Sequence, residues 1–67
     1  MKELGTKLRD ARKAAGLYQE GLARRVGVSV DTVRRWESGA REPRASDLQS
    51  LAGVLGADVV AALFVKM

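Results

Sequence analysis

The middle of the chain carries four closely spaced side chains that fit the edges of DNA base pairs: Val30, Asp31, Arg34 and Arg35. Arginine donates two hydrogen bonds to O6 and N7 of guanine, a carboxylate accepts from N4 of cytosine, and valine packs on the methyl group of thymine. In a helix, where each residue turns the chain by about 100°, all four lie opposite Val33 and Trp36. The pattern predicts a helix that contacts bases with one face and the protein core with the other.

Two plainer interpretations of these residues stay open. The arginines could contact phosphate groups only, and Asp31 and Arg35 could form an ion pair along a solvated helix, because they are four positions apart. A carboxylate is also repelled by nearby phosphates unless Arg35 or a cytosine amine compensates it, and such repulsion can reject wrong sites. We expect Arg35 to contact a base, and we leave base contact by Val30, Asp31 and Arg34 open.

The elements that must position these side chains are predicted to be helices, because apolar residues recur at intervals of three and four along the chain. Glycines follow the periodic segments, as expected at helix C-termini: Gly16, Gly27, Gly39 and Gly56. The inward residues expected for the first helix are Leu4, Leu8, Ala11 and Ala15. The predicted helices run over about Lys2–Ala15, Gln19–Val26, Ser29–Ser38, Asp47–Leu55 and Asp58–Val65.

Serine residues mark the expected starts of two helices. Ser29 is a good N-cap, and Ser46 followed three residues later by Gln49 has the form of a capping box, which predicts that the fourth helix starts at Asp47. The connection Gly27 to Ser29 is so short that the second and third helices must cross steeply. The third helix should therefore project from the domain and be able to enter a groove.

The charge of the chain favours a polyanionic partner. The 67 residues include 12 Lys and Arg against 8 Asp and Glu, giving a net charge of +4, and eleven of the twelve basic residues lie within residues 1–47. Hydrophobic residues make up 46% of the chain, which predicts a packed core, and the length predicts a single domain over residues 1–67.

Several classes of function are disfavoured by what the sequence lacks. Cysteine and histidine are absent, which removes thiolate and imidazole ligands and the commonest general base, and we expect no metal, no cofactor and no enzyme activity. The first ten residues are charged and lack the apolar stretch of a signal peptide, so we expect none. No apolar run approaches the length of about 20 residues that is needed to span a bilayer. We therefore expect a cytoplasmic protein that is nucleoid-associated when bound to DNA.

Nearly the whole chain matches the residue pattern of one known protein family, with the same spacing between the matching residues and no internal gap. The matching residues are Leu8, Arg12, Gly16-Leu17, Gln19, Leu22-Ala23, Gly27-Val28-Ser29, Thr32-Val33, Trp36-Glu37, Gly39, Pro43, Leu48, Leu51-Ala52, Leu55-Gly56 and Leu63. With this set the chain closely resembles the phage repressor and Cro-like (XRE) helix-turn-helix family. The resemblance implies an all-α, five-helix, lambda-repressor-like DNA-binding domain whose helix at about Ser29–Ser38 lies in the major groove.

The resemblance also implies roles for individual residues. Gln19 takes the position at which the family anchors a phosphate, although it could simply solvate a helix end. Arg12 and Glu37 correspond to a buried ion pair between the first and third helices, and Trp36 to a core residue. Further phosphate contacts are expected from Thr32, Arg41 and Arg44, although the last two could belong to a solvated loop.

The C-terminal segment is more apolar than a core of this size requires. We expect it to form a two-fold contact between two copies, as family members often do, through Val59, Val60, Leu63 and Phe64. Two alternatives are that the last helix only covers the core and that the chain is cut from a longer protein.

Two functions follow from these patterns. The leading hypothesis is a homodimeric transcriptional repressor or regulator that binds a palindromic operator in double-stranded DNA. The alternative is a protein-interaction module with the same fold, such as an antitoxin subunit whose partner is a toxin or another regulator. Adjacent arginines on the reading face favour the first, and the apolar C-terminal segment permits the second.

Overall fold

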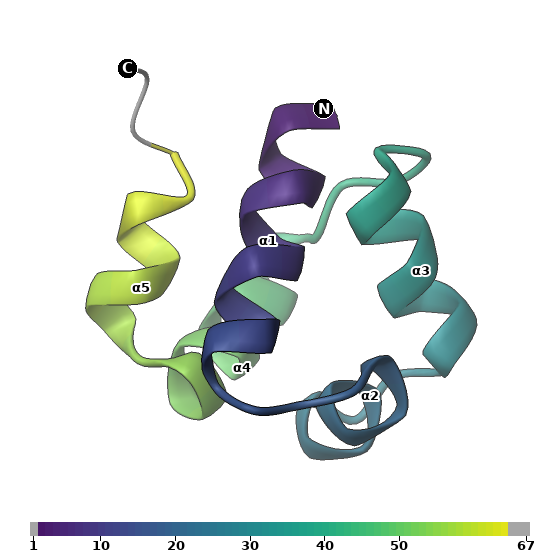
Figure 1. The fold of residues 1–67 in the computed structure, drawn as a ribbon, viewed down its shortest axis with the longest axis horizontal. Helices are drawn as coiled ribbons and strands as arrows, with labels where there is room; N and C mark the ends of the chain where they lie inside the picture. The colour runs from purple at the N-terminus through teal and green to yellow at the C-terminus, as the bar shows by residue number, and fades with distance from the viewer. Residues whose placement is uncertain (1, 65–67) are drawn as a thin grey trace.

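A computed structural model describes residues 2–64, and helices account for most of them. In Figure 1, α3 and α5 lie on opposite sides of α1, with α2 below them and α4 behind. Within the described residues there is no strand, so the prediction of an all-α, five-helix fold is confirmed. No helix in this part of the chain has the length and apolarity to cross a membrane. The helices are α1 (Lys2–Ala14), α2 (Gln19–Val26), α3 (Val30–Ser38), α4 (Ala45–Leu55) and α5 (Ala57–Ala62).

The core is built from the inward stripes of these helices. Leu8, Leu22 and Leu51 are completely inaccessible to solvent, which places α1, α2 and α4 around one apolar centre. Ala15 was expected to face inward and is exposed, because α1 ends at Ala14 and the chain turns at Gly16. The buried apolar residues are Leu4, Leu8, Leu22, Ala23, Val33, Trp36, Leu51, Val60 and Leu63.

The turn after α1 depends on Gly16. Its φ angle is +75°, a left-handed conformation in which a side chain would be strained. The backbone N–H groups of Gly16 and Leu17 donate to the carbonyls of Lys13 and Arg12, at 2.9 and 3.1 Å. These bonds satisfy the last carbonyls of α1 and lead the chain directly into α2.

The predicted capping box at Ser46 is wrong. Helix α4 starts at Ala45, two residues earlier than expected, and Arg44 occupies the N-cap position. The Asp47 carboxylate accepts a hydrogen bond of 2.9 Å from the Arg44 backbone N–H. An ionised acceptor in the first turn also interacts favourably with the helix dipole, so Asp47 rather than Ser46 determines the start of α4.

The expectation for the C-terminal segment is partly wrong. Val60 and Leu63 were expected at a dimer interface, but they are only 7% and 6% exposed and belong to the core of a single chain. The spacing of three residues places them together on the inward face, whereas Val59 and Phe64 are 38% and 51% exposed. Helix α5 also begins one residue earlier than predicted and ends at Ala62, so the predicted helix over Asp58–Val65 is too long by at least Leu63 and Phe64. Val65 itself lies outside the described residues.

Gly5 sets how closely α1 approaches α3, a role that the sequence did not reveal. A Cβ atom at this buried position would lie 2.5 Å from the carbonyl oxygen of Trp36 and in contact with that of Glu37. These are backbone atoms and cannot rotate away. The absence of a side chain at Gly5 therefore lets the C-terminal end of α3 pack directly on α1.

Candidate nucleic-acid interface

Helices α2 and α3 are joined by a tight turn of Gly27, Val28 and Ser29. Gly27 ends α2 with a φ angle of +86°, and its N–H donates to the carbonyl of Ala23 at 2.9 Å. Ser29 begins α3, because its Oγ accepts the N–H of Thr32 at 3.1 Å. Ala23 is buried and small, which allows the two helices to approach closely. These local signals build the predicted pair of crossed helices.

Helix α3 has one buried face and one exposed face. Val33 and Trp36 are 0% and 1% exposed, whereas Arg34 and Arg35 are exposed. Val30, which was also expected to face DNA, is half-buried and packs against the core. The structure therefore presents both arginines on the outward face, with only part of Val30 beside them.

Asp31 and Arg35 form an ion pair on this outward face. The Arg35 Nε lies 2.8 Å from Asp31 Oδ2, and the two side chains are 59% and 63% exposed. The sequence left two interactions open for these residues, contact with DNA bases and an ion pair along the helix, and the structure contains the ion pair. Both side chains nevertheless remain accessible from the solvent side of α3.

Arg12 lies at the centre of a buried polar cluster. Its Nε is 2.7 Å from Glu37 Oε2 and its Nη2 is 3.2 Å from Glu37 Oε1, with side-chain exposures of 7% and 4%. Its Nη1 donates to the carbonyl oxygen of Leu17 at 2.8 Å. The structure thus contains the ion pair implied by the family resemblance, and it links α1, the loop after α1 and α3.

Gln19 belongs to the same cluster through a contact that the sequence did not reveal. Its Nε2 donates to Glu37 Oε1 at 3.1 Å. A side-chain amide has two N–H donors, so the second one stays available at the start of α2. Glu37 therefore positions both the buried arginine and the residue expected to contact a phosphate.

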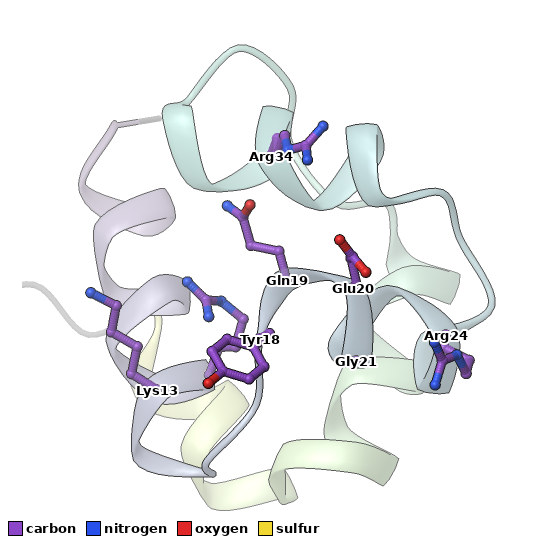
Figure 2. Close-up of a pocket in the computed structure, with 8 residues that line it drawn as sticks. Lys13, Tyr18, Gln19, Glu20, Gly21, Arg24 and Arg34 are labelled. Carbon is purple, nitrogen blue, oxygen red and sulfur yellow. The ribbon is translucent and has the colours of Figure 1, made fainter.

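A hollow of about 620 Å³ opens beside this cluster between α1, α2 and α3 (Figure 2). In Figure 2, Gln19 and Glu20 extend from α2 toward the side on which Arg34 lies. The sequence interpretation did not include Lys13, Tyr18 and Arg24, although two of them are basic and all three are exposed. Tyr18 is 84% exposed and its side chain does not cap α2. The lining residues are Arg12, Lys13, Tyr18, Gln19, Glu20, Gly21, Arg24 and Arg34.

The other expected phosphate contacts border α3. Thr32 is half-buried, and its Oγ1 lies 2.9 Å from Ser29 Oγ at the start of the helix. Arg41 and Arg44 are exposed in the segment between α3 and α4. Within residues 2–64, no group of three or more acidic side chains could hold a metal ion.

The helix-turn-helix domain family matches residues 3–63, which include both crossed helices and the turn between them. The chain belongs to the helix-turn-helix family. In such domains the second helix of the motif lies in the major groove and the first crosses the sugar-phosphate backbone, and here these helices are α3 and α2.

Two relatives are named as regulators. The chain is 41% identical over 51 residues to an uncharacterized HTH-type transcriptional regulator, YazB, of Bacillus subtilis (strain 168), covering 76% of this chain and 74% of the relative. It is 38% identical over 56 residues to an uncharacterized transcriptional regulator in the ATPase CF(0) region of Rhodospirillum rubrum, covering 84% of this chain. The chain spans about half, 52%, of the length of that second relative. No solved structure matches the chain.

Proposed function

We propose that this helix-turn-helix chain is a transcriptional repressor that binds a palindromic operator as a homodimer, with α3 in the major groove of each half-site. The main support is the exposure of Arg34 and Arg35 on a helix whose opposite face, Val33 and Trp36, is buried. In this geometry the arginines reach base edges without any change in the core. Asp31 and the exposed part of Val30 complete the proposed reading face.

The start of α2 supplies a phosphate contact in this proposal. No side-chain cap occupies the first-turn amides of α2, so these amides and the helix dipole favour an anion. Gln19 adds an amide donor whose orientation is fixed by Glu37. Because Glu37 is on α3, the phosphate anchor and the reading helix keep one relative position.

Phosphate contacts on the other side of α3 come from Arg41 and Arg44, with Thr32 at the start of the helix. Such contacts release condensed counterions and fix the register of the protein on DNA, but they carry no sequence information. The proposal therefore separates affinity, which depends on salt, from base choice, which depends on the outward face of α3.

A second copy would bind at α5. Val59 and Phe64 are exposed apolar side chains, and α5 lies across α1 from α3 (Figure 1). A two-fold contact there leaves both reading helices free, and the family geometry requires them to be about 34 Å apart, one turn of DNA. Analytical ultracentrifugation should show a dimer that Phe64→Ser weakens, and a monomer at all concentrations would contradict this part of the proposal.

In vitro selection of bound duplexes from a random pool tests the function. We expect an enriched sequence with two inverted half-sites, bound with an affinity that falls steeply as salt rises. Arg35→Ala should reduce the preference for that sequence. Arg25→Ala is the matched control, since it removes one exposed positive charge from α2 outside the reading face and the hollow. Recovery of no common sequence would contradict the proposal.

The same two apolar side chains, Val59 and Phe64, favour the alternative of a protein-interaction module such as an antitoxin subunit. In that case the partner would bind α5 and the selection would enrich no sequence. Sequence-selective DNA binding by the isolated chain would exclude this module as its sole function.

A further inference from the structure

We infer that Asp31 is a positioning residue for Arg35, and that the pair reads one guanine as a unit. Asp31 holds the Nε edge of the guanidinium and leaves the two terminal amino groups to the base. This inference rests on the proposed DNA-binding function and narrows it, because it assigns Asp31 to its neighbour rather than to a base of its own.

The atoms that form the ion pair carry the inference. Asp31 Oδ2 lies 2.8 Å from Arg35 Nε, the donor nearest the aliphatic part of the side chain. A guanidinium has five N–H donors in one plane, so the four on Nη1 and Nη2 remain. Guanine needs two of them, for O6 and N7. Base contact and the ion pair are therefore compatible in a single conformation of Arg35.

The ion pair of Asp31 and Arg35 is too exposed to contribute much to the stability of the fold. Both side chains are more than half exposed, and ion pairs of this kind contribute little to stability because water and salt screen them. A carboxylate on a DNA-facing helix is also unfavourable near phosphates. On DNA, however, a guanidinium already held in place loses less conformational freedom on binding than a free one.

The neighbouring Arg34 provides an internal comparison. It is exposed on the same helix but makes no ion pair or side-chain hydrogen bond within the part of the chain that the structure describes. Its guanidinium is free to adapt to a phosphate or a base. Substitution of Asp31 should therefore affect only the base pair that Arg35 reads.

The test measures binding of four proteins to an operator in which each base pair is replaced in turn: the unchanged chain, Asp31→Ala, Arg35→Ala and the double variant. The unchanged chain should prefer guanine at one position by roughly tenfold to a hundredfold. Asp31→Ala should lower this preference several-fold at that position only, and Arg35→Ala should abolish it. The double variant should equal Arg35→Ala, because Asp31 acts through Arg35.

Asp31→Asn sharpens the test, since its amide oxygen still accepts from Nε without the negative charge. It should retain part of the preference lost in Asp31→Ala. Circular dichroism melting curves of all variants check that each is folded.

Two results would overturn the inference: an Arg35-dependent preference that is unchanged in Asp31→Ala, or an effect of Asp31→Ala at a base pair that persists when Arg35 is absent. Failure of the proposed function has a different signature, because the unchanged chain would then show no preference at any position.

Discussion

The molecule contains two pairs of arginine and carboxylate in opposite surroundings. Arg12 and Glu37 are almost completely buried, and their hydrogen-bonding groups are matched by Leu17 and Gln19. The pair of Arg35 and Asp31 has a similar N to O distance but lies in solvent. Burial makes a charge expensive to leave unpaired, whereas water replaces a lost partner at the surface. Loss of one partner should therefore destabilise the buried pair's surroundings strongly, whereas the exposed pair can be changed with little effect on the fold and is free to serve recognition.

The largest expected effect comes from breaking the buried pair. Arg12→Ala leaves the Glu37 carboxylate buried without its partner, and should lower the free energy of unfolding by about 3–5 kcal/mol. Urea denaturation followed by the fluorescence of buried Trp36 measures this. Replacement of both partners, Arg12→Met with Glu37→Leu, should cost clearly less. Equal losses in the single and double variants would show that the charge is not the cause.

The second largest effect on stability is expected at the close approach of Gly5 on α1 to the backbone of α3. Gly5→Ala places a methyl group against the carbonyls of Trp36 and Glu37, and should destabilise the domain by about 1–3 kcal/mol. Gly53→Ala is the control, because nothing lies within 4 Å of a Cβ there and the change should stabilise α4 by about 0.5–1 kcal/mol. Thermal melting should move in opposite directions for the two variants, and a shared direction would contradict the close approach.

The smallest effect on stability is expected at the exposed pair. Asp31→Ala should change the free energy of unfolding by less than about 1 kcal/mol, and the change should diminish further at high salt. The same urea titration, at low and high salt, checks this. A loss as large as that of Arg12→Ala would remove the distinction between the two pairs.

Local signals account for what the sequence predicted well. Residues within one or two helical turns determine the left-handed conformation of Gly27 and the N-cap at Ser29. The same is true of the two faces of α3, with Val33 and Trp36 inward and the arginines outward. The ion pair of Arg12 and Glu37 came from the family resemblance rather than from spacing, because its partners are 25 positions apart.

Long-range and ambiguous contacts account for what the sequence missed. The bond from Gln19 to Glu37 and the approach of Gly5 to α3 join distant segments, and nothing local signals them. In α5 nearly every residue is apolar, so the pattern could not separate the inward Val60 from the outward Val59. The sequence thus located the proposed reading face, whereas the side of α5 that faces the core required the structure.

The two-faced construction of α3 bears on how such a protein diversifies. Val33 and Trp36 anchor the helix in the core, whereas Asp31, Arg34 and Arg35 on the same helix are exposed and do not contribute to the core. Under the proposed function, substitutions of these residues would change the DNA sequence that the protein binds while the fold stays the same. Regulators with different DNA targets would then arise from one fold through a few substitutions in the nine residues of α3.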